Sequence, residues 1–149
     1  MEDNPLFVLL ADDDKDDCFL FQLVLEELQL NTQLTTVHDG EKLMQLLTQD
    51  TNKPPTVLFL DLNMPRKNGF ESFVEIKLNE KLKHIPVIIF STSFEQEMAD
   101  LLYKNGANFY IRKPSEFSEL TKVIYHVLTI SAKTNFAQPT KDKFLLTGK

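Results

Sequence analysis

The chain has 149 residues, of which 42% are hydrophobic and 26% are charged, and these numbers fit one domain with a full core. Its net charge of −6 argues against nucleic-acid binding, which usually requires a basic surface. It has no apolar run long enough to cross a membrane and no signal-peptide pattern, and its single cysteine, Cys18, fits a reducing compartment. We therefore expect a cytoplasmic protein that binds neither nucleic acid nor membrane.

Short apolar runs alternate with segments of helical periodicity along the chain. The predicted strands are residues 6–11, 33–38, 56–60, 86–90 and 108–111. The predicted helices are residues 16–29, 41–50, 68–81, 95–105 and 116–130. The first, third and fourth strands are apolar almost throughout, which is typical of parallel strands with both faces covered.

Alternating strands and helices with short connections predict a parallel sheet with right-handed crossovers. The predicted fold class is α/β, a doubly wound five-stranded parallel sheet of order 2-1-3-4-5 with helices on both faces, flavodoxin-like. In such a sheet the functional site lies at the carboxyl ends of the strands. Residues 1–131 form this predicted domain.

Residues 132–149 break the pattern and carry four lysines against one aspartate, a charge of +3. We expect them to form a disordered or loosely docked tail, with folding onto a partner or a second subunit as the alternative. The segment is too short to be an effector domain.

Acidic residues end two of the predicted strands. Asp12 and Asp13 follow the first strand, and Asp61 follows the third. These strand ends are expected to be neighbours, and three clustered carboxylates repel one another unless a cation is present. Hard oxygen ligands of this kind suit Mg²⁺, beside which Asp61 could attack phosphorus and become an aspartyl phosphate. A solvated helix-capping turn is the alternative for the first acidic run, and Asp14, Asp16 and Asp17 are assigned to that role.

The fourth and fifth strands end in a hydroxyl and a cation. Ser91 could donate a hydrogen bond to a phosphate oxygen, although a lone serine after a strand is more often a turn or cap residue. Lys113 would supply a positive charge opposite the metal ion. The Lys113-Pro114 bond is also a candidate cis peptide, since cis bonds concentrate before proline.

Together these residues resemble the receiver domain of two-component response regulators, of the CheY-like, single-domain kind. The resemblance covers about residues 5–131. The matching residues are Asp12-Asp13, Asp61-Leu62-Asn63-Met64-Pro65 with Asn68-Gly69, Ser91, and Tyr110-Ile111-Arg112-Lys113-Pro114.

The resemblance implies that Asp61 is the phosphoacceptor of a phosphorelay and receives its phosphoryl group from a sensor histidine kinase or a histidine phosphotransfer protein. Asp13, Asp61 and the backbone carbonyl of Asn63 would bind Mg²⁺ directly, and Asp12 would act through a water molecule. It further implies a signalling protein rather than an enzyme, with only self-phosphotransfer and self-dephosphorylation.

Four further roles are expected around this acceptor. Lys113 would hold the phosphate or the carboxylate, and Ser91 and Tyr110 would form a switch pair in which the ring turns inward once the hydroxyl binds phosphate. Asn63 and Ser93 flank the expected path of the attacking water, so we expect them to tune the phosphate lifetime.

Two surfaces are expected to bind proteins. The first helix is apolar over more than one stripe, and we expect it, with Phe21 as a contact residue, to dock the phosphohistidine helices of a kinase; a thoroughly buried helix is the alternative. Homodimerisation through the face of the fourth helix, fifth strand and fifth helix is common among relatives and is expected here. The sequence does not name the downstream protein.

Three other functions are disfavoured. A phosphohydrolase of the haloacid-dehalogenase type needs a second acid two residues after its nucleophile, where this chain has Asn63. A flavin-binding module needs a Ser/Thr/Gly-rich phosphate loop in place of the acidic run that begins at Asp12. A phosphorylation-independent interaction module usually lacks the acid or the lysine, and both Asp61 and Lys113 are present.

Overall fold

The computed structural model describes residues 5–49 and 53–148, and the predicted helix end at Asp50 lies outside them. All strands of the sheet run parallel in the order β2-β1-β3-β4-β5-β6, so the predicted doubly wound fold is confirmed with one more strand than expected. The elements are β1 (Leu6–Ala11), α1 (Lys15–Leu28), β2 (Thr32–Val37), α2 (Gly40–Leu47), β3 (Val57–Leu60), α3 (Gly69–Leu78), β4 (Val87–Ser91), α4 (Gln96–Lys104), β5 (Phe109–Arg112), α5 (Phe117–Lys133), the 3-10 turn η1 (Lys141–Lys143) and β6 (Leu145–Leu146).

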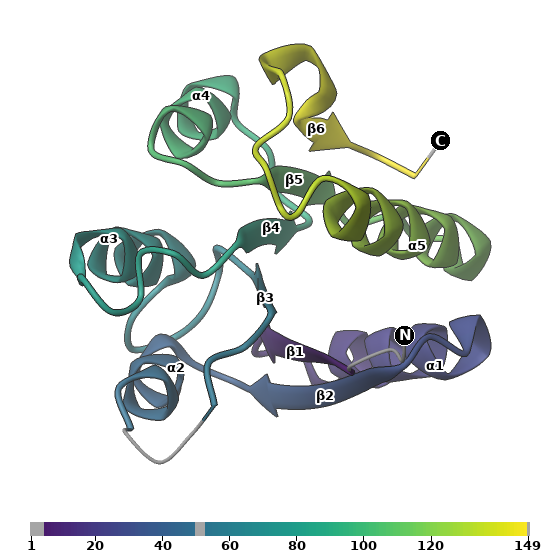
Figure 1. Ribbon diagram of the computed structural model, residues 1–149, viewed down its shortest axis with the longest axis horizontal. Helices are drawn as coiled ribbons and strands as arrows, with labels where there is room; N and C mark the ends of the chain where they lie inside the picture. The colour runs from purple at the N-terminus through teal and green to yellow at the C-terminus, as the bar shows by residue number, and fades with distance from the viewer. Residues whose placement is uncertain (1–4, 50–52, 149) are drawn as a thin grey trace.

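The sheet separates two apolar cores. Helices α1 and α5 cover one face, and α2, α3 and α4 cover the other (Figure 1). Strand β3 is buried along its whole length because both faces are covered, which explains its continuous apolar sequence. The core on the α1 side contains three phenylalanine rings in edge-to-face contact, Phe21, Phe59 and Phe90.

This packing corrects the prediction for Phe21. Its side chain is fully buried, with its ring centroid 4.9 Å from that of Phe59, so it cannot contact a docked partner. The exposed apolar residues of α1 are Phe19 and Leu20, which are 59% and 37% exposed.

Helix starts follow from local capping. Asp14 accepts hydrogen bonds from the backbone N–H groups of Asp16 and Asp17, as its cap-like position predicts. Asn68 and Glu71 form a reciprocal capping box at the start of α3. These caps fix where α1 and α3 begin, each being the first helix after a strand that leads into the acidic residues.

The C-terminal segment is ordered, so the expectation of a disordered or loosely docked tail is wrong. Residues 134–148, which we call the strap, pack along β5, and β6 pairs in parallel with it (Figure 1). Phe144 is 3% exposed and joins the core on the α4 side. The side-chain hydrogen bonds that secure the strap include Asn108 Nδ2 to the Phe136 carbonyl (2.8 Å), Gln138 Nε2 to the Ala107 carbonyl (2.7 Å), and Tyr103 OH to the Pro139 carbonyl (2.9 Å).

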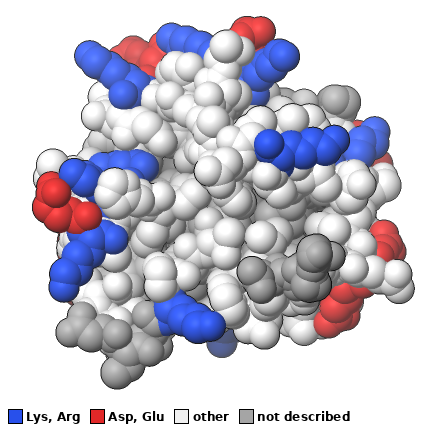
Figure 2. Space-filling model, in the orientation of Figure 1, with Lys and Arg blue, Asp and Glu red and all other residues white. Residues whose placement is uncertain are grey.

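No cis peptide bond occurs in the described ranges, so the expected cis bond before Pro114 is absent. Among the described helices, none combines the length and apolar character that a membrane span requires. On the face seen in Figure 2, charged side chains of both signs are scattered mostly towards the rim, and the basic ones do not gather into one patch.

Candidate functional site

The predicted site residues meet at the carboxyl ends of β1, β3, β4 and β5. The chain makes a tight turn after β3, which is closed by a hydrogen bond of 3.0 Å from the Gly69 N–H to the Leu62 carbonyl oxygen. A Cβ atom at position 69 would lie 2.0 Å from the carbonyl oxygen of Asp61. Glycine is therefore required where α3 begins, and this close approach holds Asp61 at the mouth of the site.

Three carboxylates form the acidic centre. One oxygen from each of Asp12, Asp13 and Asp61 lies within 4.8 Å of the others; Asp12 and Asp61 are buried and Asp13 is exposed. Burial raises the pKa of Asp61, the charge of Lys113 lowers it and the charge of Asp12 raises it, so that the net pKa is about 6. A divalent cation would relieve this repulsion, and an all-oxygen donor set fits Mg²⁺.

Lys113 joins these carboxylates from β5. Its Nζ lies 2.6 Å from Asp12 Oδ2, 2.8 Å from Asp17 Oδ2 and 3.6 Å from Asp61 Oδ2, with the side chain 8% exposed. Burial alone would lower the pKa of Lys113, but the hydrogen bonds to Asp12 and Asp17 hold it above its ordinary value. The ammonium group therefore stays charged at the position predicted for it.

Asp17 is the residue that sequence reasoning missed. It was assigned to the helix-capping turn, yet its carboxylate reaches Lys113 while Asp14 alone supplies the cap. The available signal was its place in the first turn of α1, which starts directly after the strand end that carries Asp12.

A polar network lies beside the acidic centre. Asn63 donates from its side-chain amide to Ser93 Oγ at 3.2 Å and to Ser91 Oγ at 3.5 Å, and the two serine hydroxyls are 3.1 Å apart. The backbone N–H of Asn63 donates to Asp61 Oδ1 at 3.2 Å. The structure thus brings Ser91 and both residues expected to tune the phosphate lifetime to one side of Asp61.

Tyr110 lies behind this network with its ring directed inward. The side chain is fully buried, and its hydroxyl donates to the backbone carbonyl of Ser93. Its ring packs edge-to-face with Phe94 and Phe144, at centroid distances of 5.4 and 6.4 Å. Burial raises the pKa of the Tyr110 hydroxyl, which therefore acts as a neutral donor.

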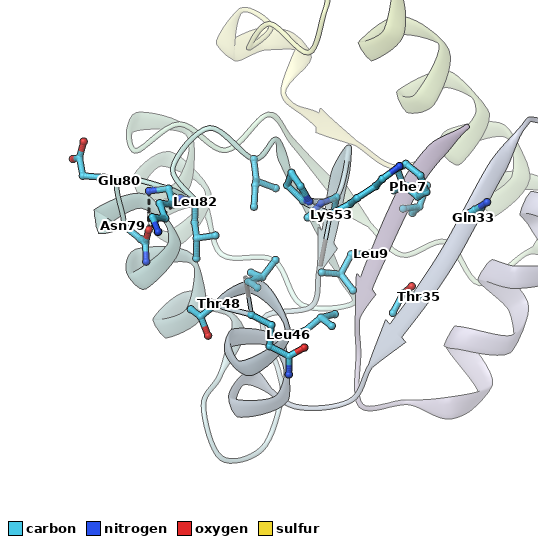
Figure 3. A pocket seen from close by; sticks show the side chains of 17 residues that line it. Phe7, Leu9, Gln33, Thr35, Leu46, Thr48, Lys53, Asn79, Glu80 and Leu82 are labelled. Atoms are coloured by element: carbon cyan, nitrogen blue, oxygen red, sulfur yellow. Dashed lines mark hydrogen bonds between the residues drawn. The ribbon is translucent and has the colours of Figure 1, made fainter. Parts of the chain in front are cut away.

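A large cavity of about 850 Å³ lies elsewhere, at the amino-terminal end of the sheet. It is bordered by the start of β1, by β2, by the end of α2 and by the segment after α3, with Leu9, Thr35, Leu46 and Leu82 among its lining residues (Figure 3). None of the predicted site residues lines it.

Comparison with known proteins shows similarity in both sequence and fold. Residues 8–125 match the sequence model of one family, the response regulator receiver domain. Response regulator Rcp1 of Synechocystis sp. is 36% identical over 124 residues, which are 80% of this chain and 84% of that protein.

Two solved structures share the fold at similar identity. The phosphorylated cyanobacterial phytochrome response regulator RcpA is 31% identical, with a TM-score of 0.81 over 88% of this chain and 96% of that one. The Mn²⁺-bound form of Rcp1 is 31% identical, with a TM-score of 0.80 over 91% of this chain and 100% of that one. A divalent metal, Mn²⁺, is therefore bound in one relative, and this chain has a cluster of three carboxylates that could hold a metal ion.

Proposed function

The chain belongs to the response regulator receiver family, and from this premise we propose that Asp61 is its phosphoacceptor. The observation that carries the proposal is the place of Asp61, whose buried carboxylate ends β3 between two other carboxylates and the ammonium of Lys113. The ammonium of Lys113 offsets only part of the repulsion in that position, because the pKa of Asp61 remains raised.

Phosphotransfer to Asp61 replaces a P–N bond of the donor with an O–P bond of the acceptor. A carboxylate oxygen of Asp61 forms a new O–P bond as the P–N bond of a phosphohistidine breaks, and the departing imidazole takes a proton from solvent. Lys113 would hold a phosphoryl oxygen by its ammonium group. Beyond transfer to itself and loss of its own phosphate, we assign the chain no reaction.

We assign the metal site to Asp12, Asp13, Asp61 and the backbone carbonyl of Asn63, with Mg²⁺ as the ion. When bound, Mg²⁺ supplies positive charge that offsets the charge of the carboxylates and of the phosphoryl group. The crowding of acidic oxygens within 4.8 Å supports this assignment.

The proposed switch joins Ser91 to Tyr110. A phosphoryl group on Asp61 adds acceptor oxygens that compete for the Ser91 hydroxyl, which now lies 3.1 Å from Ser93 Oγ. The Tyr110 hydroxyl is bound to the carbonyl of the same Ser93. A shift of Ser91 towards the phosphate therefore reaches Tyr110 through Ser93.

We propose a histidine kinase or histidine phosphotransfer protein as the partner, docked over α1 at the exposed Phe19 and Leu20. Receiver domains take their phosphoryl groups from histidine kinases, and similarity to a phytochrome response regulator makes a phytochrome-linked kinase the first to test. Output would pass through protein contacts in the cytoplasm. Any homodimer on the α4–β5–α5 face would include the strap, because β6 occupies the edge of β5.

Acetyl phosphate with Mg²⁺ tests the acceptor directly. The protein should gain one phosphoryl group, located at Asp61 by peptide mass spectrometry, and the Asp61→Asn variant should gain none. Asp16→Asn, which removes an exposed acid from α1, is the matched control and should be modified like the wild type. Modification that persists in Asp61→Asn, or none in the wild type, would overturn the proposal.

A further inference from the structure

Lys113 is shared among three carboxylates, and one of them lies outside the acidic centre. Asp12 and Asp61 belong to the group whose oxygens lie within 4.8 Å of one another, together with Asp13. Asp17 does not belong to it, yet its Oδ2 is 2.8 Å from Lys113 Nζ, closer than the 3.6 Å of Asp61 Oδ2. The ammonium is thus drawn away from the acceptor and towards α1.

This placement matters because Lys113 and a divalent cation need the same oxygens. Lys113 Nζ is already 2.6 Å from Asp12 Oδ2, so without another partner its charge would be neutralised by Asp12 and Asp61 alone. A cation entering the site would then have to displace the ammonium from both carboxylates. A carboxylate that is not a metal ligand gives Lys113 a partner that the metal does not take away.

We propose that Asp17 is a positioning residue that holds Lys113 at the edge of the site, leaving the oxygens of Asp12 and Asp61 available to a divalent cation. The proposal rests on the proposed function, because it assigns Asp17 a part in metal binding at that site. Asp17 acts only through Lys113 and touches neither the metal nor the phosphoryl group.

Asp16 provides a control for the ordinary role of an acid at a helix start. It lies in the same first turn of α1, its backbone N–H is bound to the same Asp14 cap, and its side chain is exposed. Both acids lie in the first turn, where a negative charge interacts favourably with the helix dipole. Of these two acids, only Asp17 forms an ion pair with Lys113.

The test is the affinity of the full chain for Mn²⁺, measured by electron paramagnetic resonance of the free ion. Loss of a residue that orients a metal site typically lowers affinity about 10- to 100-fold, so Asp17→Asn should weaken Mn²⁺ binding at least about tenfold. Asp16→Asn should change it by no more than about twofold, the effect of one exposed charge. Asp17→Glu should restore most of the affinity. Asp17→Ser removes the carboxylate with a different side chain, so a folding defect in one variant does not decide the result.

A double-mutant cycle tests whether the effect passes through Lys113. In a Lys113→Met background, Asp17→Asn should weaken Mn²⁺ binding no more than Asp16→Asn does. Equal effects of Asp17→Asn and Asp16→Asn in the wild-type background, or a full Asp17 effect without Lys113, would overturn the positioning role alone. A wild-type protein that neither binds Mn²⁺ nor accepts phosphate from acetyl phosphate would overturn the proposed function, and this inference with it.

Discussion

The backbone N–H of Tyr110 donates to the carbonyl oxygen of Phe144 at 3.0 Å, and the two rings lie edge-to-face with centroids 6.4 Å apart. The proposed switch residue and the strap therefore form one packing unit. Phe144 also contacts Tyr103 of α4, at a centroid distance of 5.1 Å. Because the contact is shared, the inward position of the Tyr110 ring and the docking of the strap stabilise each other.

Removing the Phe144 ring should destabilise the whole domain. Phe144→Ala leaves a cavity between Tyr103 and Tyr110, and deletions of this kind cost about 3 to 5 kcal/mol. Leu145→Ala is the matched control on the same strap, because Leu145 is 39% exposed and should cost less than about 1 kcal/mol. Urea unfolding followed by circular dichroism measures both. Equal losses for the two variants would show that Phe144 is not the anchor.

The strap was not predictable from apolar periodicity. Its buried anchor is a single phenylalanine beside Lys143, and β6 has only two residues, which is too short for a strand pattern to appear. Other contacts include hydrogen bonds from Asn108, Gln138 and Tyr103 to backbone carbonyls, which no hydrophobic pattern reveals. The strap follows from tertiary contacts, whereas the five-unit sheet follows from local sequence.

The strand-end site was predictable because an acid after a buried strand has few structural explanations. Asp12, Asp61 and Lys113 meet where the alternation of strands and helices placed them. The prediction that Phe21 contacts a partner is wrong, although the helical spacing of the apolar residues indicates its buried position. Phe21 lies three residues after Cys18 and four before Leu25, both buried, which places it on the core stripe.

The stability of the metal-free protein should fall as pH rises through the titration of Asp61. A folded-state pKa of about 6, above the ordinary value of 3.8, means that the folded protein binds this proton more tightly than the unfolded chain does. The free energy of unfolding therefore falls as the pH rises from about 4 to about 6, and it keeps this lower value above that range.

Asp61→Asn removes this cost, so with EDTA present the variant should be more stable than the wild type at about pH 8, by roughly 3 kcal/mol. The difference should disappear near about pH 4, where Asp61 is protonated in the folded wild type. Urea midpoints at the two pH values measure it, with Asp16→Asn as the control. A variant no more stable than the wild type at the higher pH would contradict the assigned burial cost.

Asn63 should lengthen the life of the phosphorylated state. Its side-chain amide contacts the hydroxyls of Ser91 and Ser93, and Asn63→Ala would free both hydroxyls and open a path for water towards Asp61. The loss of one such hydrogen bond is worth about 1 kcal/mol, so the rate of phosphate loss should rise about fivefold. Intact-mass measurements after removal of acetyl phosphate give this rate. Asn105→Ala, which alters an exposed amide at the end of α4, should leave it unchanged.

Docking of a kinase over α1 should depend on the Phe19 side chain and not on exposed apolar side chains elsewhere on the surface. Phe19→Asp places a charge where a phenylalanine is 59% exposed, and disruption of a central aromatic contact should slow transfer from a phosphorylated histidine kinase by about tenfold or more. Modification by acetyl phosphate should be unaffected, because Phe19 is absent from the contacts of the acidic centre. Leu78→Asp is the matched control, since Leu78 is 79% exposed on α3, which covers the opposite face of the sheet. If Phe19→Asp slows both phosphate donors equally, or Leu78→Asp slows the kinase as much, then α1 is not the docking surface.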